Sequence, residues 1–301
     1  MTSSLEETKF ILKKYNITAN KRLGQNFLID DNTIESIVEI AKTNKEDLVI
    51  EIGPGLGTLT SKLLENAGKV IAIELDEKMI KILEDRFKFY NNFILLNEDV
   101  LKVDLQELIK QNKGELKKVK IIANLPYYIT TPIIMKLLEN KLDIESITVM
   151  VQKEVADRIT AAPGDKLSGA ITYSVDYYAE ATSEIFVDKN SFIPAPEVDS
   201  EVIKLKIRKE PKVKVKDEKL FFDIIKASFM QRRKTLLNGL MNSKLFNSKE
   251  EILEIFSKMN IDPQIRGEKL TIEQFAELTN LKNWQKGHSY LSILFYALGH
   301  S

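Results

Sequence analysis

The sequence predicts a doubly wound α/β domain followed by a small all-helical domain. Between about residues 33 and 151, short apolar runs alternate with longer segments of helical spacing. Nearly continuous apolar strands joined by helical crossovers are typical of a parallel sheet that is covered on both faces. From about residue 220 to 281, in contrast, every segment has helical periodicity. These two observations define the fold class.

The first domain contains a regular order of elements. Strands are predicted at 47–52, 69–74, 93–96, 120–123 and 147–151, and helices at 58–66, 78–87 and 131–139. The run 201–208 alternates strictly between apolar and charged residues, which predicts a half-buried strand at the end of the sheet. We therefore assign 1–208 to the sheet domain, 209–219 to a charged linker, 220–282 to the helical domain and 283–301 to a tail.

Composition limits the available chemistry. The chain has 301 residues, no Cys and two His, both near the C-terminus. This excludes disulfides, thiol nucleophiles and thiolate metal sites, and it argues against a catalytic zinc site, so we expect no metal. No signal peptide is recognisable, and no apolar run approaches the ~20 residues of a membrane span. We expect a cytoplasmic protein with no membrane partner.

The balanced total of 44 Lys and Arg against 44 Asp and Glu hides a local asymmetry. Residues 203–244 hold 13 Lys and Arg against 4 Asp and Glu, whereas residues 46–110 hold 8 against 13. The basic segment at the domain junction indicates either a polyanion-binding patch or a solvated linker with a charged helix face.

A glycine-rich loop follows the first predicted strand of the sheet. Glu51 precedes Gly53, Gly55 and Gly57, and Glu74 ends the next strand. Glycines let a ligand approach the backbone, and a carboxylate at the end of the second strand can accept both hydroxyls of a ribose. The spacing departs from the dinucleotide pattern, and an acidic residue before the glycines suits a cofactor with an amino group and a sulfonium. A purely structural loop is the alternative.

Two further segments end strands at the same edge. Asp99 follows the third strand and suits a hydrogen bond from an adenine amino group, although it is equally typical of a turn. Asn124, Leu125, Pro126 and Tyr127 follow the fourth strand. The amide oxygen of Asn124 and the Leu125 carbonyl can accept the two hydrogens of an exocyclic amine, Pro126 stiffens the turn, and Tyr127 offers a flat face for a base.

The segment 124–127, Asn-Leu-Pro-Tyr, resembles the signature of S-adenosylmethionine-dependent methyltransferases that act on adenine N6. Three more segments, 21–28, 192–196 and 229–236, resemble the ribosomal RNA adenine dimethyltransferases of the KsgA type. The resemblance runs from about residue 21 to 278. It implies a Rossmann-like methyltransferase sheet, S-adenosylmethionine as cofactor, and dimethylation of two adjacent adenines near the 3′ end of 16S rRNA in the small ribosomal subunit.

The resemblance also implies roles for single residues. Asn26 and Leu28 would close over the cofactor, Gly53 would lie against it, and Asn124 would stand between cofactor and base. Glu74 would bind its ribose and Asp99 its adenine. Phe192 would hold the flipped adenine, with a core position as the alternative. RNA phosphates would contact five cationic residues, each of which is otherwise an ordinary surface charge: Lys153, Arg158, Arg232, Arg233 and Lys234.

Several alternatives stay open at this point. A 23S rRNA dimethyltransferase shares the first domain, although the 194–196 segment and the 232–236 helix favour the small-subunit enzyme. A DNA adenine methyltransferase and a dinucleotide oxidoreductase fit the sequence less well. A ribosome-assembly factor that acts by binding is an alternative of another class, and a role in small-subunit biogenesis does not exclude the enzyme. We expect a monomer, because RNA rather than a second subunit should cover the basic patch. The tail after about Lys282 matches nothing in the family pattern, and we assign it no function.

Overall fold

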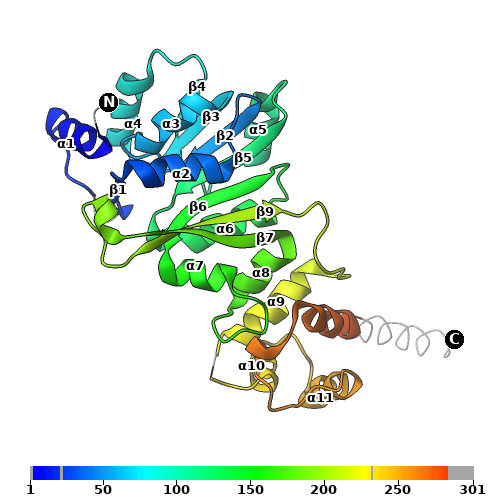
Figure 1. Ribbon diagram of the computed structural model, residues 1–301. Helices are drawn as coiled ribbons and strands as arrows, with labels where there is room; N and C mark the ends of the chain where they lie inside the picture. The colour runs from blue at the N-terminus through cyan, green and yellow to red at the C-terminus, as the bar shows by residue number, and fades with distance from the viewer. Residues whose placement is uncertain (1–2, 21–22, 232, 284–301) are drawn as a thin grey trace. The chain divides into compact units, whose positions relative to one another are not determined.

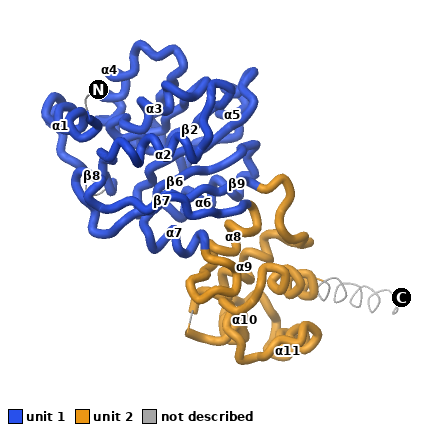
Figure 2. The backbone as a smooth tube through the Cα atoms, in the orientation of Figure 1, with its two compact units in different colours: residues 1–160, 179–207 blue, residues 161–178, 208–301 orange. Residues whose placement is uncertain are grey.

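The computed structural model describes residues 3–20, 23–231 and 233–283. The chain divides into two compact units (Figure 2), of which unit 1 comprises Met1–Thr160 and Ala179–Ile207 and unit 2 comprises Ala161–Tyr178 and Arg208–Ser301. From the sequence we expect a sheet domain to residue 208, a linker at 209–219 and a helical domain from residue 220. In the structure, unit 2 includes the segment 209–219 and also takes in 161–178.

Unit 1 is built on a seven-stranded sheet with the order β4-β3-β2-β5-β6-β9-β7 (Figure 1). The first five strands in that order are parallel, β9 pairs antiparallel with β6, and β7 pairs antiparallel with β9. The strands are β2 (Asp47–Ile52), β3 (Lys69–Glu74), β4 (Phe93–Asn97), β5 (Lys118–Asn124), β6 (Ser146–Gln152), β7 (Ala179–Val187) and β9 (Ser200–Ile207). This confirms the predicted Rossmann-like sheet.

Helices cover both faces of this sheet (Figure 1). They are α1 (Ser4–Lys14), α2 (Asp31–Ala41), α3 (Thr58–Asn66), α4 (Glu77–Phe87), α5 (Leu105–Lys113), α6 (Thr130–Glu139) and α7 (Lys153–Thr160), with short 3-10 turns η2 (Tyr127–Ile129) and η3 (Lys189–Ser191). Most begin with an Asp or Ser whose side chain accepts a backbone N–H of the first turn, as Asp30 does from Thr33 and Asp76 from Lys78.

The core explains why the strands are so apolar. All six residues of β2 are buried. In the centre of the sheet Ile50 pairs with Ile71 on one side and Ile121 on the other, and all three are inaccessible to solvent. Such a strand can lie only in the middle of a sheet whose two faces are both covered.

The run 201–208 does form the predicted strand, β9, but its predicted place at the end of the sheet is wrong. Strand β9 lies inside the sheet, between β6 and β7, and the unpredicted β7 forms the edge. The cationic face of β9 is only partly exposed, because Lys204 reaches across to α2 and its Nζ donates to the Ile40 carbonyl at 2.6 Å. A long lysine side chain thus occupies a position that the alternation assigns to solvent.

A two-stranded ribbon lies outside the main sheet. Strand β1 (Phe27–Leu28) pairs antiparallel with β8 (Phe192–Ile193), which brings Leu28 opposite Phe192. Three of these four side chains, those of Phe27, Leu28 and Phe192, belong to the main hydrophobic core of unit 1. The ribbon therefore anchors the segment before Phe27 to the body of the unit.

Unit 2 is helical in its described part, with α8 (Ala170–Tyr178), α9 (Glu218–Phe229), α10 (Leu236–Asn242), α11 (Lys249–Lys258), a 3-10 turn η4 (Gly267–Lys269) and a helical stretch at 272–283. An aromatic cluster joins α8 to the rest. Tyr173 contacts the rings of Phe229 and Phe275 with centroids 5.3 and 5.0 Å apart, and its hydroxyl donates to the Leu270 carbonyl at 2.6 Å. This cluster is why 161–178 belongs to the helical unit.

The charged segment 209–219 is attached to its own unit. The Lys212 backbone N–H donates to the Tyr177 carbonyl at 3.0 Å, and Lys212 Nζ pairs with Asp176 at 2.8 Å. Asp217 caps α9, which starts at Glu218. Across the described ranges of both units, no helix combines the length and the apolar character that crossing a bilayer requires.

Candidate cofactor and substrate site

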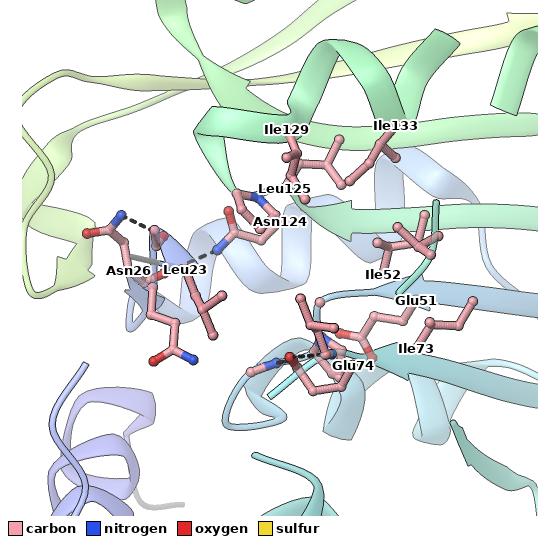
Figure 3. Close-up of a pocket in the computed structure, with 18 of the residues that line it drawn as sticks. Leu23, Asn26, Glu51, Ile52, Ile73, Glu74, Asn124, Leu125, Ile129 and Ile133 are labelled. Atoms are coloured by element: carbon pink, nitrogen blue, oxygen red, sulfur yellow. Dashed lines mark hydrogen bonds between the residues drawn. The ribbon is translucent and has the colours of Figure 1, made fainter. Parts of the chain in front are cut away.

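A pocket in unit 1 lies at the carboxyl ends of strands β2, β3, β4 and β5, the usual ligand edge of a doubly wound sheet (Figure 3). Residues 23–28, which we call the strap, form part of its wall. The predicted site residues that line it are Asn26, Leu28, Glu51, Gly53, Gly55, Glu74, Asp99, Asn124, Leu125, Pro126 and Tyr127. The structure therefore brings together residues from four strand ends and from the N-terminal segment.

The glycine loop needs its glycines for two different reasons. Gly53 and Gly55 have φ of +68° and +57°, in the left-handed region that favours glycine. Gly57 has φ +83°, and a Cβ there would lie 2.6 Å from the Phe87 ring. Gly57 also precedes α3 without a side-chain cap, so the first N–H groups of that helix are left to other acceptors.

Glu74 is held by backbone donors from both sides of the pocket. Its Oε2 accepts the Gly55 N–H at 3.1 Å, and its Oε1 accepts the N–H groups of Leu75 and Asp76 at 2.8 and 2.9 Å. Burial raises the pKa of the carboxyl, and these three hydrogen bonds offset part of the rise. The carboxylate is thus preorganised at the end of β3, with lone pairs that remain for hydroxyl donors.

Glu51 is a buried carboxyl with an unsatisfied oxygen. Its side chain lies beside the glycine loop (Figure 3) and the residue is 1% exposed. Its Oε2 has no hydrogen-bond partner among the described residues. Burial raises the pKa of Glu51 to about 8. A buried acceptor without a donor is costly unless a ligand supplies one, so Glu51 fits a cationic or N–H-bearing group in the pocket.

Asp99 lines the pocket but also has a local role. Its Oδ1 accepts the Leu101 N–H at 3.0 Å, and Lys102 Nζ lies 4.0 Å from its Oδ2. The turn and the ligand interpretations of Asp99 are therefore compatible, because a carboxylate has more than one acceptor position.

The segment after β5 is fixed by three hydrogen bonds. Asn124 Nδ2 donates to the Asn26 carbonyl at 3.3 Å (Figure 3), and the Leu125 N–H donates to the Met150 carbonyl at 3.2 Å. The Tyr127 hydroxyl lies 2.8 Å from Ser200 Oγ on β9. Each group that the sequence analysis assigned to the target amine or base thus has a defined position before any ligand binds.

The pocket lining includes several residues that were not predicted as site residues, and two of them are Tyr128 and Gln25. Tyr128 lines the pocket and is 55% exposed, so its ring is more accessible than that of Tyr127. Gln25, in the strap, binds Asp76 across the pocket wall. The two consecutive tyrosines were a visible signal for the first, whereas a side-chain contact between positions 51 residues apart leaves none.

The structure does not bring Phe192 into the pocket. Its ring is 3% exposed and belongs to the core that the β1–β8 ribbon closes. In this conformation the ring presents no face to a base, and the residue occupies the core position that the sequence analysis gave as the alternative.

The predicted RNA-binding cations have different surroundings. In unit 1, Lys153 pairs with Asp157 and, at 2.8 Å, with the buried Glu201, and Arg158 pairs with Glu154. In unit 2, Arg233 and Lys234 lie between α9 and α10 and are exposed, with no ion pair to another described residue. Arg232 lies outside the described residues. The unit 2 pair is therefore the better placed to accept phosphates.

The site holds acceptors, aromatic faces and backbone donors rather than metal ligands. Within residues 3–20, 23–231 and 233–283, no group of three His, Cys, Asp or Glu side chains is arranged to hold a metal ion. A pocket with one ribose-type carboxylate, one buried unsatisfied carboxyl and an anchored amide can bind a nucleoside with a cationic substituent and place an amine beside it.

Comparison with known proteins agrees with this chemistry. A family model described as ribosomal RNA adenine dimethylase matches residues 16–283. A "Ribosomal RNA small subunit methyltransferase A" from Clostridium botulinum is 51% identical over 273 residues, covering 91% of this chain and 97% of that protein. A protein with the same name from a Geobacillus species is 48% identical over 276 residues, covering 91% and 94%.

Solved structures give the same fold. A dimethyladenosine transferase from Plasmodium falciparum superposes with a TM-score of 0.70 at 28% identity, covering 84% of this chain and 95% of that one. The 23S rRNA methyltransferase ErmE superposes with a TM-score of 0.64 at 24% identity, covering 86% and 100%, and this second likeness concerns the fold alone.

Proposed function

The chain belongs to the ribosomal RNA adenine dimethylase family, and from this premise we propose the following reaction. The protein transfers methyl groups from S-adenosylmethionine to N6 of two adjacent adenines near the 3′ end of 16S rRNA in the small ribosomal subunit. The observation that carries the proposal is the anchored Asn124 amide, whose Nδ2 already donates one of its N–H groups to the Asn26 carbonyl. Its oxygen remains for an exocyclic amine at the pocket.

The pocket fits S-adenosylmethionine by the chemistry of its groups. Glu51 would face the cationic amino-acid end, because its buried oxygen lacks a partner. Glu74 would accept the ribose hydroxyls, Asp99 would accept from the adenine amino group, and Gly53 and Gly55 would let the backbone approach. When bound, this cofactor supplies an electrophilic methyl group on a sulfonium.

The protein's own groups would do the rest by positioning. An exocyclic adenine amine is a poor nucleophile, because its lone pair is delocalised into the ring. The Asn124 oxygen and the Leu125 carbonyl would accept its two hydrogens, which favours a pyramidal nitrogen whose lone pair points at the methyl group. The proton can leave after transfer, so the site needs no general base. Positioning of this kind lowers a barrier by at most ~7–11 kcal/mol.

The target base must leave its stack to reach the pocket. Stacking on an aromatic ring is worth ~1–3 kcal/mol per base, which offsets part of the few kcal/mol that extrusion costs. Tyr127, held at Ser200, would supply that face. The family role of Phe192 would require its ring to leave the core that it occupies here. Arg232, Arg233 and Lys234 would contact phosphates, with Lys153 and Arg158 as further candidates.

The proposed substrate would place the protein in the cytoplasm, and we propose that it acts there as a monomer. The test is to incubate it with methyl-labelled S-adenosylmethionine and with small or large ribosomal subunits that lack the modification. We expect label in the small subunit only. Label in 23S rRNA alone would assign the chain to the other substrate class, and no label in either subunit would refute the proposal.

A further inference from the structure

The strap, residues 23–28, is tied to the two halves of the pocket by different side chains. On the cofactor side, Gln25 Nε2 donates to Asp76 Oδ2 at 2.8 Å, while Gln25 Oε1 accepts the Asn20 backbone N–H at 2.8 Å. One amide therefore links the strap both to Asn20 and to the loop after β3. The contact with Asp76 is partly buried and charge-assisted, which makes it stronger than an exposed neutral hydrogen bond.

Asp76 connects this contact to the ribose carboxylate. Its Oδ1 caps α4 through the Lys78 N–H at 2.9 Å, and its own backbone N–H donates to Glu74 Oε1 at 2.9 Å. A continuous path thus runs from Gln25 through Asp76 to the Glu74 carboxylate. By holding Asp76, Gln25 fixes the loop after β3 in the position in which the Asp76 N–H orients the Glu74 carboxylate.

On the substrate side, the strap orients the catalytic amide. The carbonyl of Asn26, the residue after Gln25, accepts from Asn124 Nδ2 at 3.3 Å. That bond selects one of the two amide orientations and leaves the oxygen for the target amine. The opposite orientation would turn N–H groups toward an amine that must itself donate, which would repel it. The peptide between Asn26 and Phe27, one residue beyond Gln25, therefore sets the acceptor geometry at Asn124.

We propose that Gln25 is a positioning residue that couples cofactor binding to the orientation of Asn124 by clasping the strap to Asp76. The inference rests on the proposed function and extends it. Gln25 itself touches no reacting atom. Its hydrogen bond fixes the strap, the strap carbonyl fixes the Asn124 amide, and the same contact steadies the loop that carries Glu74.

The test exchanges the donor and the acceptor of the hydrogen bond between Gln25 and Asp76. Gln25→Glu keeps the acceptor for Asn20 but places a second carboxylate against Asp76. The double variant Gln25→Glu with Asp76→Asn restores an amide-to-carboxylate hydrogen bond in the reverse direction, and it keeps a side-chain oxygen to cap α4. Gln111→Glu is the matched control, because Gln111 Nε2 makes the same kind of bond to Glu107 at 2.9 Å on the exposed face of α5.

Two measurements distinguish a positioning role of Gln25 from a role in the stability of the fold alone. For Gln25→Glu at pH 8 we expect single-turnover methyl transfer at saturating cofactor to fall about tenfold or more, and S-adenosylhomocysteine to bind about tenfold more weakly by calorimetry. We expect the double variant to recover to within about threefold of wild type in both. The control should change neither.

Any of three results would overturn this positioning role of Gln25. The first is wild-type kinetics and binding in Gln25→Glu, and the second is a double variant that is no better than the single one. The third is a fall in thermal stability with an unchanged rate per folded molecule. The failure of the proposed function is a separate outcome. If wild type methylates no subunit, the calorimetric comparison of the same variants still decides whether the Gln25–Asp76 hydrogen bond supports binding of S-adenosylhomocysteine.

Discussion

Cofactor affinity should depend on pH through Glu51. Burial raises the pKa of this carboxyl to about 8, so the free protein holds it protonated near neutrality. The proposed contact with the cationic end of S-adenosylmethionine favours the ionised form. Binding must therefore release a proton, and its cost is about 1.4 kcal/mol for each pH unit below the pKa. This amounts to about 3 kcal/mol at pH 6 and about half of that at pH 7.

The affinity should consequently rise about tenfold per pH unit from pH 6 to 7.5. The interval stops there because the α-amino group of the cofactor loses its own proton near pH 8. Calorimetry with S-adenosylmethionine in two buffers of different ionisation enthalpy measures both the affinity and the released proton. Glu51→Gln should bind more weakly at pH 7.5 and with a flat profile. Glu98→Gln, a change at an exposed carboxylate of the same pocket, should keep the wild-type slope.

The stability of the free protein should change in the opposite direction. A raised carboxyl pKa contributes stability that is complete below the ordinary pKa of 4.5 and is lost as the pH rises through about 8. The unfolding free energy of wild type relative to Glu51→Gln should therefore fall between those values. A flat affinity profile for wild type, with no proton released at pH 7, would refute this interpretation of Glu51.

The other predictions concern transfer, folding and RNA affinity. Asn124→Ala should leave cofactor affinity nearly intact, because the residue orients the amine, and should slow single-turnover transfer by orders of magnitude; an unchanged rate would remove Asn124 from the mechanism. Gly57→Ala should lower the unfolding free energy by about 1–3 kcal/mol, because φ is +83° at this position and the new Cβ would meet Phe87. Urea titration measures this change, and equal unfolding midpoints for wild type and variant would contradict it. Lys234→Ala should weaken RNA binding and reduce the slope of log affinity against log salt by about 1. Lys153→Ala should have a smaller effect, since Lys153 is already paired with acids, and equal effects of the two variants would contradict this ranking.

The local sequence pattern was sufficient to predict the strands and the helix that carry the site residues. The strands 47–52 and 69–74 and the helix 58–66 have the predicted bounds. The two strands are apolar along nearly their whole length, and the leucines of the helix lie on one face with helical spacing. The same strands place Glu51, the glycine loop and Glu74 at one edge. Motif spacing within a strand–loop–helix unit is local information, and it carries over into the structure directly.

The pairing of segments that lie far apart in the chain could not be predicted from the local sequence. Strand β7 was missed because most of its residues are exposed or half-buried, so it has no apolar signature, and without it 201–208 was placed at the end of the sheet. The burial of Phe192 follows from its pairing with Leu28, which lies 164 positions earlier in the chain. The ion pair of Lys153 with Asp157 has helical spacing and was foreseeable, whereas the pair with Glu201 depends on the sheet order.

The proposed function requires that this chain dimethylates two adjacent adenines of small-subunit rRNA. Mass spectrometric mapping of the 3′-terminal fragment of 16S rRNA, after treatment of unmodified small subunits with the protein and S-adenosylmethionine, tests this requirement. We expect four methyl groups per subunit, two on N6 of each of two neighbouring adenines, and none with Asn124→Ala. Methylation at another base, at an adenine outside that fragment, or at wild-type level in the Asn124 variant would contradict it.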